Sequence, residues 1–199
     1  MKILMLGNSF IFYNDLPKTL ASLTGADVVQ HTRGGAWLAE QLNEKTQMGA
    51  ATQAALRDEK WDYVILQEMS NGPVTARESF FASVEGLCAQ ISANGAVPVL
   101  YATWAYERGS AKMASMDMPY EEMYEQLRAA YHEAGARYGA LVADVGRAFY
   151  KRADQAHLYA DDGTHPNEAG SRIAAEVLAE VILADAAERN VGEITESAE

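Results

Sequence analysis

The sequence has only one cysteine, Cys88, among its 199 residues, so an internal disulfide is excluded. Cys88 lies in a run with a helical pattern, and we favour a buried thiol over a reactive one. Proline and glycine are also sparse, at five and fifteen residues, which excludes a low-complexity chain. A chain of this length fits a single domain with one hydrophobic core.

Positive charge is scarce as well. Sixteen Lys and Arg stand against 28 Asp and Glu, for a formal net charge of -12 and a pI near 4.7. This balance argues against binding to nucleic acid or to an anionic membrane, which requires a basic surface. No apolar run approaches the roughly 18 residues of a membrane helix, and no signal peptide is evident. We expect a cytoplasmic protein, although a secreted form with its leader removed would look the same.

The chain does contain a regular alternation of β-rich runs and longer helical patterns. The predicted strands are Ile3–Leu6, Val28–Thr32, Tyr63–Gln67, Val97–Ala102 and Leu141–Val145. The predicted helices are Leu16–Leu23, Ala36–Leu56, Thr75–Ser92, Pro119–Tyr138 and Glu168–Ala187, with N-caps at Asp15 and Asn167. This alternation predicts an α/β fold, a three-layer α/β/α sandwich around a five-stranded parallel sheet. Residues 1–190 form one predicted domain, and 191–199 a flexible acidic tail.

Sites in parallel sheets gather beyond the carboxyl ends of the strands. The segments Gly7–Ser9, Arg33–Gly35, Gln67–Asn71 and Thr103–Tyr106 each follow a predicted strand, and Asp162–His165 precedes the last helix. We therefore expect all five segments to meet at one edge of the sheet.

Three of these residues can form a catalytic triad. Ser9 is the candidate nucleophile, since Gly7 permits a sharp turn after the strand. His165 is the candidate base, and Asp162, three residues earlier, can accept its other ring proton. Asp161 is the alternative acid. The competing interpretations are a serine that caps a helix and a solvated acidic loop with an incidental histidine.

Hydrolysis of an ester also requires donors for the oxyanion. Gly35, or its neighbour Gly34, can present a backbone N–H, although an ordinary strand-to-helix turn explains these glycines equally well. Gln67 and Asn71 are the candidate side-chain amides.

Aromatic residues lie near the same edge: Trp37, Tyr101, Trp104 and Tyr106. Such rings can stack on a sugar or line an acyl pocket, although they more often pack in a core. The other histidines, His31, His132 and His157, have no metal-binding spacing, and no nucleotide-binding loop is present. The sequence therefore indicates no metal or other cofactor.

Together these residues resemble the SGNH (GDSL-like) hydrolases, in family order and over almost the whole chain. The resemblance is carried by Gly7–Phe10, by Gly34 and Gly35, and by Asp162–Pro166. It implies a flavodoxin-like fold and ester hydrolysis through an acyl-serine. It also implies that Ser9, His165 and Asp162 are the triad. The oxyanion donors would be the backbone N–H groups of Ser9 and Gly35 and a side chain after the third strand.

One block departs from the family pattern. The usual Gly-x-Asn after the third strand is missing, and Leu66–Ser70 reads LQEMS instead. Members that act on acetylated carbohydrates resemble this block more closely, because theirs contains a glutamine. We therefore place Gln67 in the oxyanion hole, with Asn71 as the alternative, and expect Asn71, Trp37 and Trp104 to contact the substrate.

The prediction is a serine esterase that removes small acyl groups, most simply acetyl, from a saccharide or other small-molecule ester. The alternatives are a lipase or thioesterase for longer acyl chains and a non-catalytic flavodoxin-like binding module. The composition gives no reason to expect a nucleic-acid or membrane partner. It leaves the oligomeric state open, a homo-oligomer included.

Overall fold

The computed structural model describes residues 1–196 of the chain, and the side chains as far as residue 191. A parallel sheet lies at its centre, with strands in the order β2-β1-β3-β4-β5. The strands are β1 (Lys2–Gly7), β2 (Asp27–Thr32), β3 (Tyr63–Leu66), β4 (Val97–Ala102) and β5 (Leu141–Asp144). All five predicted strands are confirmed, and no strand end differs from its predicted position by more than one residue. The predicted α/β/α sandwich is confirmed as well.

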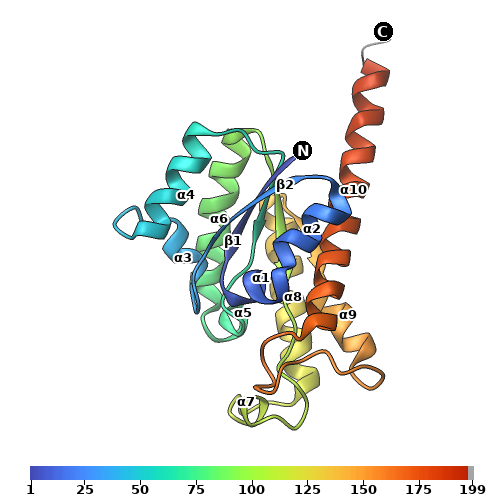
Figure 1. Ribbon diagram of the computed structural model, residues 1–199. Coiled ribbons are helices and arrows are strands. Elements are labelled where there is room, and N and C mark those ends of the chain that lie inside the picture. The colour runs from blue at the N-terminus through green and yellow to red at the C-terminus, as the bar shows by residue number, and fades with distance from the viewer. Residues whose placement is uncertain (197–199) are drawn as a thin grey trace.

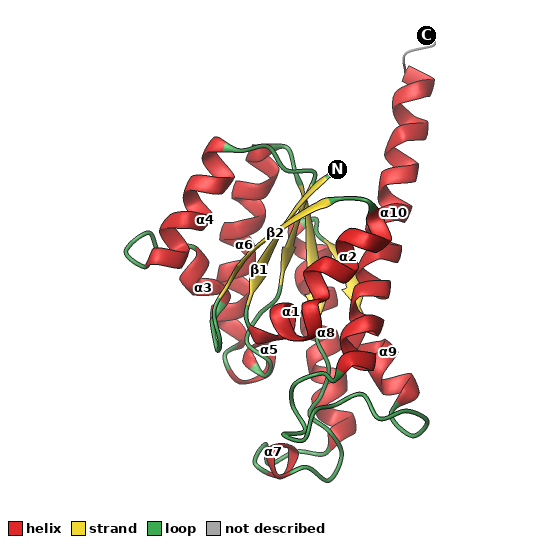
Figure 2. Ribbon diagram, viewed as in Figure 1, coloured by secondary structure: helices red, strands yellow, loops and turns green. Residues whose placement is uncertain are grey.

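The sheet divides two apolar layers because successive side chains point to opposite faces. Ile3 and Met5 pack against one group of helices, and Leu4 and Leu6 against the other. The first layer contains α1 (Ser9–Phe12), α2 (Leu16–Thr24), α9 (Val145–Arg152) and α10 (Glu168–Glu196). The second contains α3 (Leu38–Gln41), α4 (Gln47–Asp58), α6 (Arg77–Asn94) and α8 (Tyr120–Tyr138). Figures 1 and 2 show α4 and α6 on one side of the sheet and α2 and α10 on the other.

Two short helices, α5 (Gly72–Thr75) and α7 (Ala111–Ala114), lie beyond the carboxyl ends of β3 and β4. In Figure 1 they occupy the lower end of the molecule. The loops at this edge of the sheet are the ones that the sequence predicts to meet.

The predicted helix over 36–56 is wrong in one respect, because the structure breaks it into α3 and α4. Thr46 begins α4 as its N-cap and accepts a hydrogen bond from the Gly49 N–H at 3.0 Å. A hydroxyl in this position satisfies a free donor of the first turn, which favours a new start over a continuous helix. Helices α1, α5, α7 and α9 were not predicted.

The two predicted N-caps differ. Asn167 caps α10 and accepts from the Gly170 N–H at 3.0 Å, as expected. Asp15 precedes α2 but makes no capping bond, because its φ of 53° is left-handed. Helix α10 continues past the expected end at Ala187 to Glu196, and in Figure 1 this part projects from the body. Of the predicted tail 191–199, residues 197–199 lie outside the described part of the chain.

Candidate active site

Ser9 lies where β1 ends and α1 begins. Only glycine fits at position 7, because a Cβ there would lie 2.5 Å from the Gln67 Oε1 atom. Asn8 caps α1 by accepting from the Phe10 N–H at 3.2 Å, and its own Nδ2 donates to the Ala36 carbonyl. These bonds leave Ser9 at the first position of the helix, half-buried, with its hydroxyl 2.8 Å from the His165 Nε2 atom.

Asp162 completes a chain of hydrogen bonds from Ser9. Its Oδ2 lies 2.5 Å from the His165 Nδ1, and its Oδ1 accepts the backbone N–H groups of Thr164 and His165, both at 2.9 Å. Burial acts to raise the pKa of Asp162, but hydrogen bonds from the His165 ring and from these two N–H groups outweigh it and lower the pKa. The alternative acid, Asp161, is exposed and is not bonded to His165 in the described structure.

The His165 ring is held from both sides by aromatic residues. Tyr13 stacks on it with centroids 4.3 Å apart, and Phe10 meets it edge-on at 5.6 Å. Asn14, with a left-handed φ of 53°, donates to the Pro166 carbonyl at 3.0 Å. This bond fastens the segment that carries Tyr13 to the loop that carries His165, so the imidazole has little freedom to rotate.

The glycine and amide candidates separate clearly. Gly35 has a φ of 68°, a conformation that favours glycine, and both Gly34 and Gly35 line the pocket around Ser9. Asn71 lines the same pocket. Gln67 does not, because it is 0% exposed and both ends of its amide are occupied. Its Oε1 accepts from the Asn8 N–H at 2.9 Å, and its Nε2 donates to the Glu68 carbonyl.

This pocket has a volume of about 550 Å³ and contains the Ser9 and His165 side chains. Trp37 lines it, as expected, together with Phe12, Tyr13 and Met69. Trp104 does not line it and is 1% exposed. Its ring stacks between Phe10 and Phe149 in the core, and its indole N–H donates to the Thr164 carbonyl at 3.1 Å. The expected substrate contact of Trp104 is therefore corrected to a support beneath the His165 loop.

A buried carboxyl group joins the two loops that carry Gly35 and Asn71. Glu68 is 1% exposed, and its Oε1 accepts the Leu38 N–H at 3.1 Å and the Met69 N–H at 2.6 Å. Burial raises the pKa of Glu68, and these two donors counteract that rise only in part. Neither Glu68 nor Tyr13 was predicted as a site residue, and nothing local in the sequence marks Glu68.

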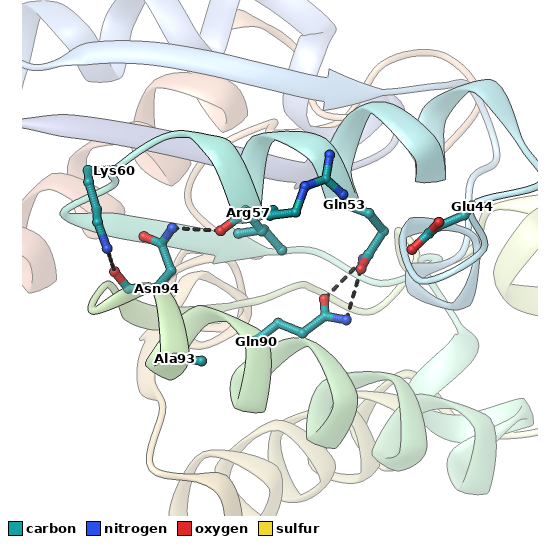
Figure 3. Close-up of a pocket in the computed structure, with 8 residues that line it drawn as sticks. Glu44, Gln53, Arg57, Lys60, Gln90, Ala93 and Asn94 are labelled. Atoms are coloured by element: carbon teal, nitrogen blue, oxygen red, sulfur yellow. Dashed lines mark hydrogen bonds between the residues drawn. The ribbon is translucent and has the colours of Figure 1, made fainter.

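A second hollow, between α4 and α6, has a different character (Figure 3). Its lining residues are Glu44, Gln53, Leu56, Arg57, Lys60, Gln90, Ala93 and Asn94. Gln53 and Gln90 bond to each other at 3.0 and 2.9 Å, and Lys60 donates to the Asn94 carbonyl at 2.9 Å. These hydrogen bonds hold α4 and α6 together. The residues that line the hollow include no nucleophile beside a base, so it is not a candidate active site.

Within 1–196, no group of three or more His, Cys, Asp or Glu side chains is arranged to hold a metal ion. None of the helices in that range is both long and apolar enough to cross a membrane.

The sequence matches the GDSL-like lipase/acylhydrolase family over residues 6–173. The chain belongs to this family. It is similar to a solved protein from Slackia heliotrinireducens that is classed with the SGNH hydrolases. The two are 50% identical, with a TM-score of 0.88, over 92% of this chain and 98% of that one. This member of the GDSL-like family is therefore an esterase or acylhydrolase of the SGNH type.

More distant structures share the fold of this GDSL-like protein. A Bacteroides uniformis protein has 23% identity and a TM-score of 0.72, over 92% of this chain and 82% of that one. Axe2, an acetyl-xylooligosaccharide esterase from a Geobacillus, has 15% identity and a TM-score of 0.67, over 91% and 93%. No curated protein matches the sequence.

Proposed function

We propose that this family member hydrolyses small-acyl esters, acetyl esters above all, of a carbohydrate or glycoside, with Ser9, His165 and Asp162 as its triad. The observation that carries the proposal is the pair of hydrogen bonds Ser9–His165 and His165–Asp162, at 2.8 and 2.5 Å, beside an open pocket. A serine hydroxyl becomes a nucleophile when a base takes its proton and a third group orients that base.

In the proposed reaction, His165 Nε2 takes the Ser9 proton as the serine oxygen bonds to the ester carbonyl carbon. The carbonyl electron pair moves to oxygen, and the tetrahedral intermediate collapses with loss of the alcohol, which takes the proton from His165. Water then attacks the acyl-serine in the same way and releases the carboxylic acid. Asp162 stays ionised throughout and stabilises the transient imidazolium, in keeping with its lowered pKa.

The oxyanion in this scheme is bound by the N–H groups of Ser9 and Gly35 and by the Asn71 amide. Ser9 is the first residue of α1, where an N–H has no partner inside the helix. The φ of 68° at Gly35 and its place on the pocket wall support the second donor. We favour Asn71 over Gln67 as the third, because the Gln67 amide is buried and occupied at both ends.

The carbohydrate part of the proposal rests on the pocket and on one distant likeness. A volume of about 550 Å³ is more than an acetyl group fills, and Trp37 and Tyr13 offer aromatic faces to a sugar ring. Axe2, which has the same fold, is named for its action on acetylated xylooligosaccharides.

The apolar side chains of Phe12, Met69 and Trp37 in the pocket wall favour the alternative function, a lipase or thioesterase for longer acyl chains. A series of p-nitrophenyl esters separates the two. We expect kcat/KM to fall steeply beyond four acyl carbons, and a maximum at eight or more would favour the lipase.

The triad is tested with a fluorophosphonate probe and p-nitrophenyl acetate. We expect one adduct, on Ser9, and loss of hydrolysis in Ser9→Ala with the unfolding midpoint in urea unchanged. Ser70→Ala is the matched control at a second serine of the same pocket, and it should still be labelled. A folded Ser9→Ala protein with wild-type turnover would exclude this triad, and a folded wild type without an adduct would favour a binding module.

A further inference from the structure

One cationic side chain reaches the pocket around Ser9 without a carboxylate partner. Lys112 lines this pocket, and none of the other lining residues is a lysine, arginine, aspartate or glutamate. The two neighbouring carboxylates are bonded to histidine rings, since Glu107 lies 3.3 Å from the His157 Nδ1 and Asp162 lies 2.5 Å from the His165 Nδ1. Within the described residues, no ion pair involves Lys112. Its charge is therefore available to a ligand.

The backbone at Lys112 is fixed to the loop that carries the triad acid and base. The Glu107 N–H donates to the Gly163 carbonyl at 2.8 Å, and Ser110 packs so closely on Gly163 that no Cβ would fit there. Ser110 also caps α7 by accepting the Met113 N–H at 3.0 Å, and Met113 is 6% exposed. Lys112 is thus held between an anchored cap and a buried side chain.

The side chain of Lys112 extends over a buried aromatic ring. Its Nζ lies 5.6 Å from the centroid of Tyr106, whose hydroxyl is 2.8 Å from the Ser70 hydroxyl. Ser70 and Tyr106 line the same pocket as Ser9. Lys112 is exposed, so its charge contributes little to stability, but the residue lines the pocket.

A lysine in this pocket is notable because the protein as a whole is strongly acidic. A net charge of -12 repels anions at long range, whereas the cationic side chain of Lys112 attracts an anion at short range. The pocket also has room for more than the acyl group, as its volume of about 550 Å³ indicates. An acetyl group carries no charge, so an anion recognised here must belong to the alcohol portion of the ester.

On the basis of the proposed function, we propose that Lys112 binds a carboxylate on the alcohol portion of the substrate, which is then the ester of an acidic sugar. Ser9 and His165 act on the ester bond, while Lys112 selects the sugar by its charge. The pocket discriminates by electrostatic attraction in addition to stacking.

The test compares two esters that differ in one charge: an O-acetylated methyl glucuronoside and the corresponding O-acetylated methyl glucoside. The measurement is the ratio of their kcat/KM values, acid to neutral, at low and high salt. We expect the wild type to favour the acid by about two- to fivefold at low salt, as for an exposed ion pair, and to lose this preference at high salt. Lys112→Met should bring the ratio down to that of the wild type at high salt, and Lys112→Glu should lower it further.

Lys45→Met is the control. Lys45 is exposed, lies outside this pocket, and its loss changes the net charge by the same amount. An equal fall of the ratio in Lys45→Met and Lys112→Met would show an effect of net charge and overturn the inference, as would a wild type without preference.

Failure of the proposed function gives a different result. In that case neither sugar ester nor p-nitrophenyl acetate is hydrolysed. The role of Lys112 is then tested separately from catalysis. NMR measures the binding of the two deacetylated glycosides to the Ser9→Ala protein. Tighter binding of the glucuronoside that depends on Lys112 would support it, and equal binding would overturn it.

Discussion

At the scale of single residues, the geometry separates side chains that look equivalent in the sequence. Gln67 and Asn71 are both amides after β3, but only Asn71 faces the pocket. The orientation of Gln67 is set by the Asn8 N–H, a partner 59 residues away. Periodicity and composition cannot reveal such a partner.

The two amides are predicted to respond differently to removal. Asn71→Ala should lower kcat by on the order of 10²–10³, the usual effect of one lost oxyanion donor, with little change in stability. Gln67→Ala leaves the buried Asn8 N–H unpaired, so it should lower the free energy of unfolding by about 1–3 kcal/mol. Steady-state kinetics and urea unfolding of both variants check this. A larger loss of kcat in a stable Gln67→Ala would restore Gln67 to the oxyanion hole.

Asp162 predicts a dependence of stability on pH. Its pKa is lowered in the folded protein, so its stabilising contribution is complete above the unfolded value of about 3.9 and is lost as the pH falls through the lowered value. The difference in unfolding free energy between wild type and Asp162→Asn should be constant from pH 7 to 5 and shrink in stronger acid. Asp161→Asn, which removes the same charge without these hydrogen bonds, is the control. A difference that grows toward acid pH would contradict the assignment.

At the scale of elements, two loops must keep fixed positions relative to each other for the proposed oxyanion donors to converge. One runs from β2 to α3 and carries Gly35, and the other runs from β3 to α5 and carries Asn71. Glu68 lies in the second loop, and its carboxylate accepts the Leu38 N–H at the end of the first loop and the Met69 N–H within its own. The site therefore depends on a buried carboxyl group that does not itself face the pocket.

Glu68→Ala is predicted to lower kcat more than it raises KM, because the displaced donors act on the transition state. Glu68→Gln keeps a carbonyl oxygen for the Leu38 and Met69 N–H groups, so it should recover most of kcat. Full kinetics of both variants, with their unfolding midpoints, distinguish this positioning role from a loss of fold. Equal kcat in the Ala and Gln variants would contradict it.

The glycine pair offers a sharper probe of the same loop. Gly35→Ala places a side chain at a φ of 68° and should reduce both kcat and stability, the latter by about 1–2 kcal/mol. Gly34→Ala meets no atom within 4 Å and has no such φ, so its effects should be smaller on both. Kinetics and urea unfolding of the two variants check this, and the reverse order would make Gly34 the donor.

At the scale of the whole molecule, the sequence predicted the sheet and the meeting of its loops. The β-rich runs that alternate with helical patterns identify β1 to β5. Loops at the carboxyl ends of parallel strands meet at one edge of the sheet, which brings Ser9 near His165. The break between α3 and α4 was missed because a local cap overrode the apolar spacing. Tyr13, Glu68 and Trp104 were missed or misplaced because their roles come from contacts between distant segments. Tyr13 alone had a usable signal, since it lies four residues after Ser9.

The Ser9–His165 hydrogen bond joins two residues that are 156 positions apart in the sequence. A cut in the exposed stretch near Asp117 would therefore leave the serine on one fragment and its base on the other. With the proposed triad, neither fragment would hydrolyse an ester by itself, and reassociation would be needed for turnover. Two proteins that bind each other could each be fused to one fragment. Their binding would then bring the fragments together, and hydrolysis of a p-nitrophenyl ester would report it as a colour.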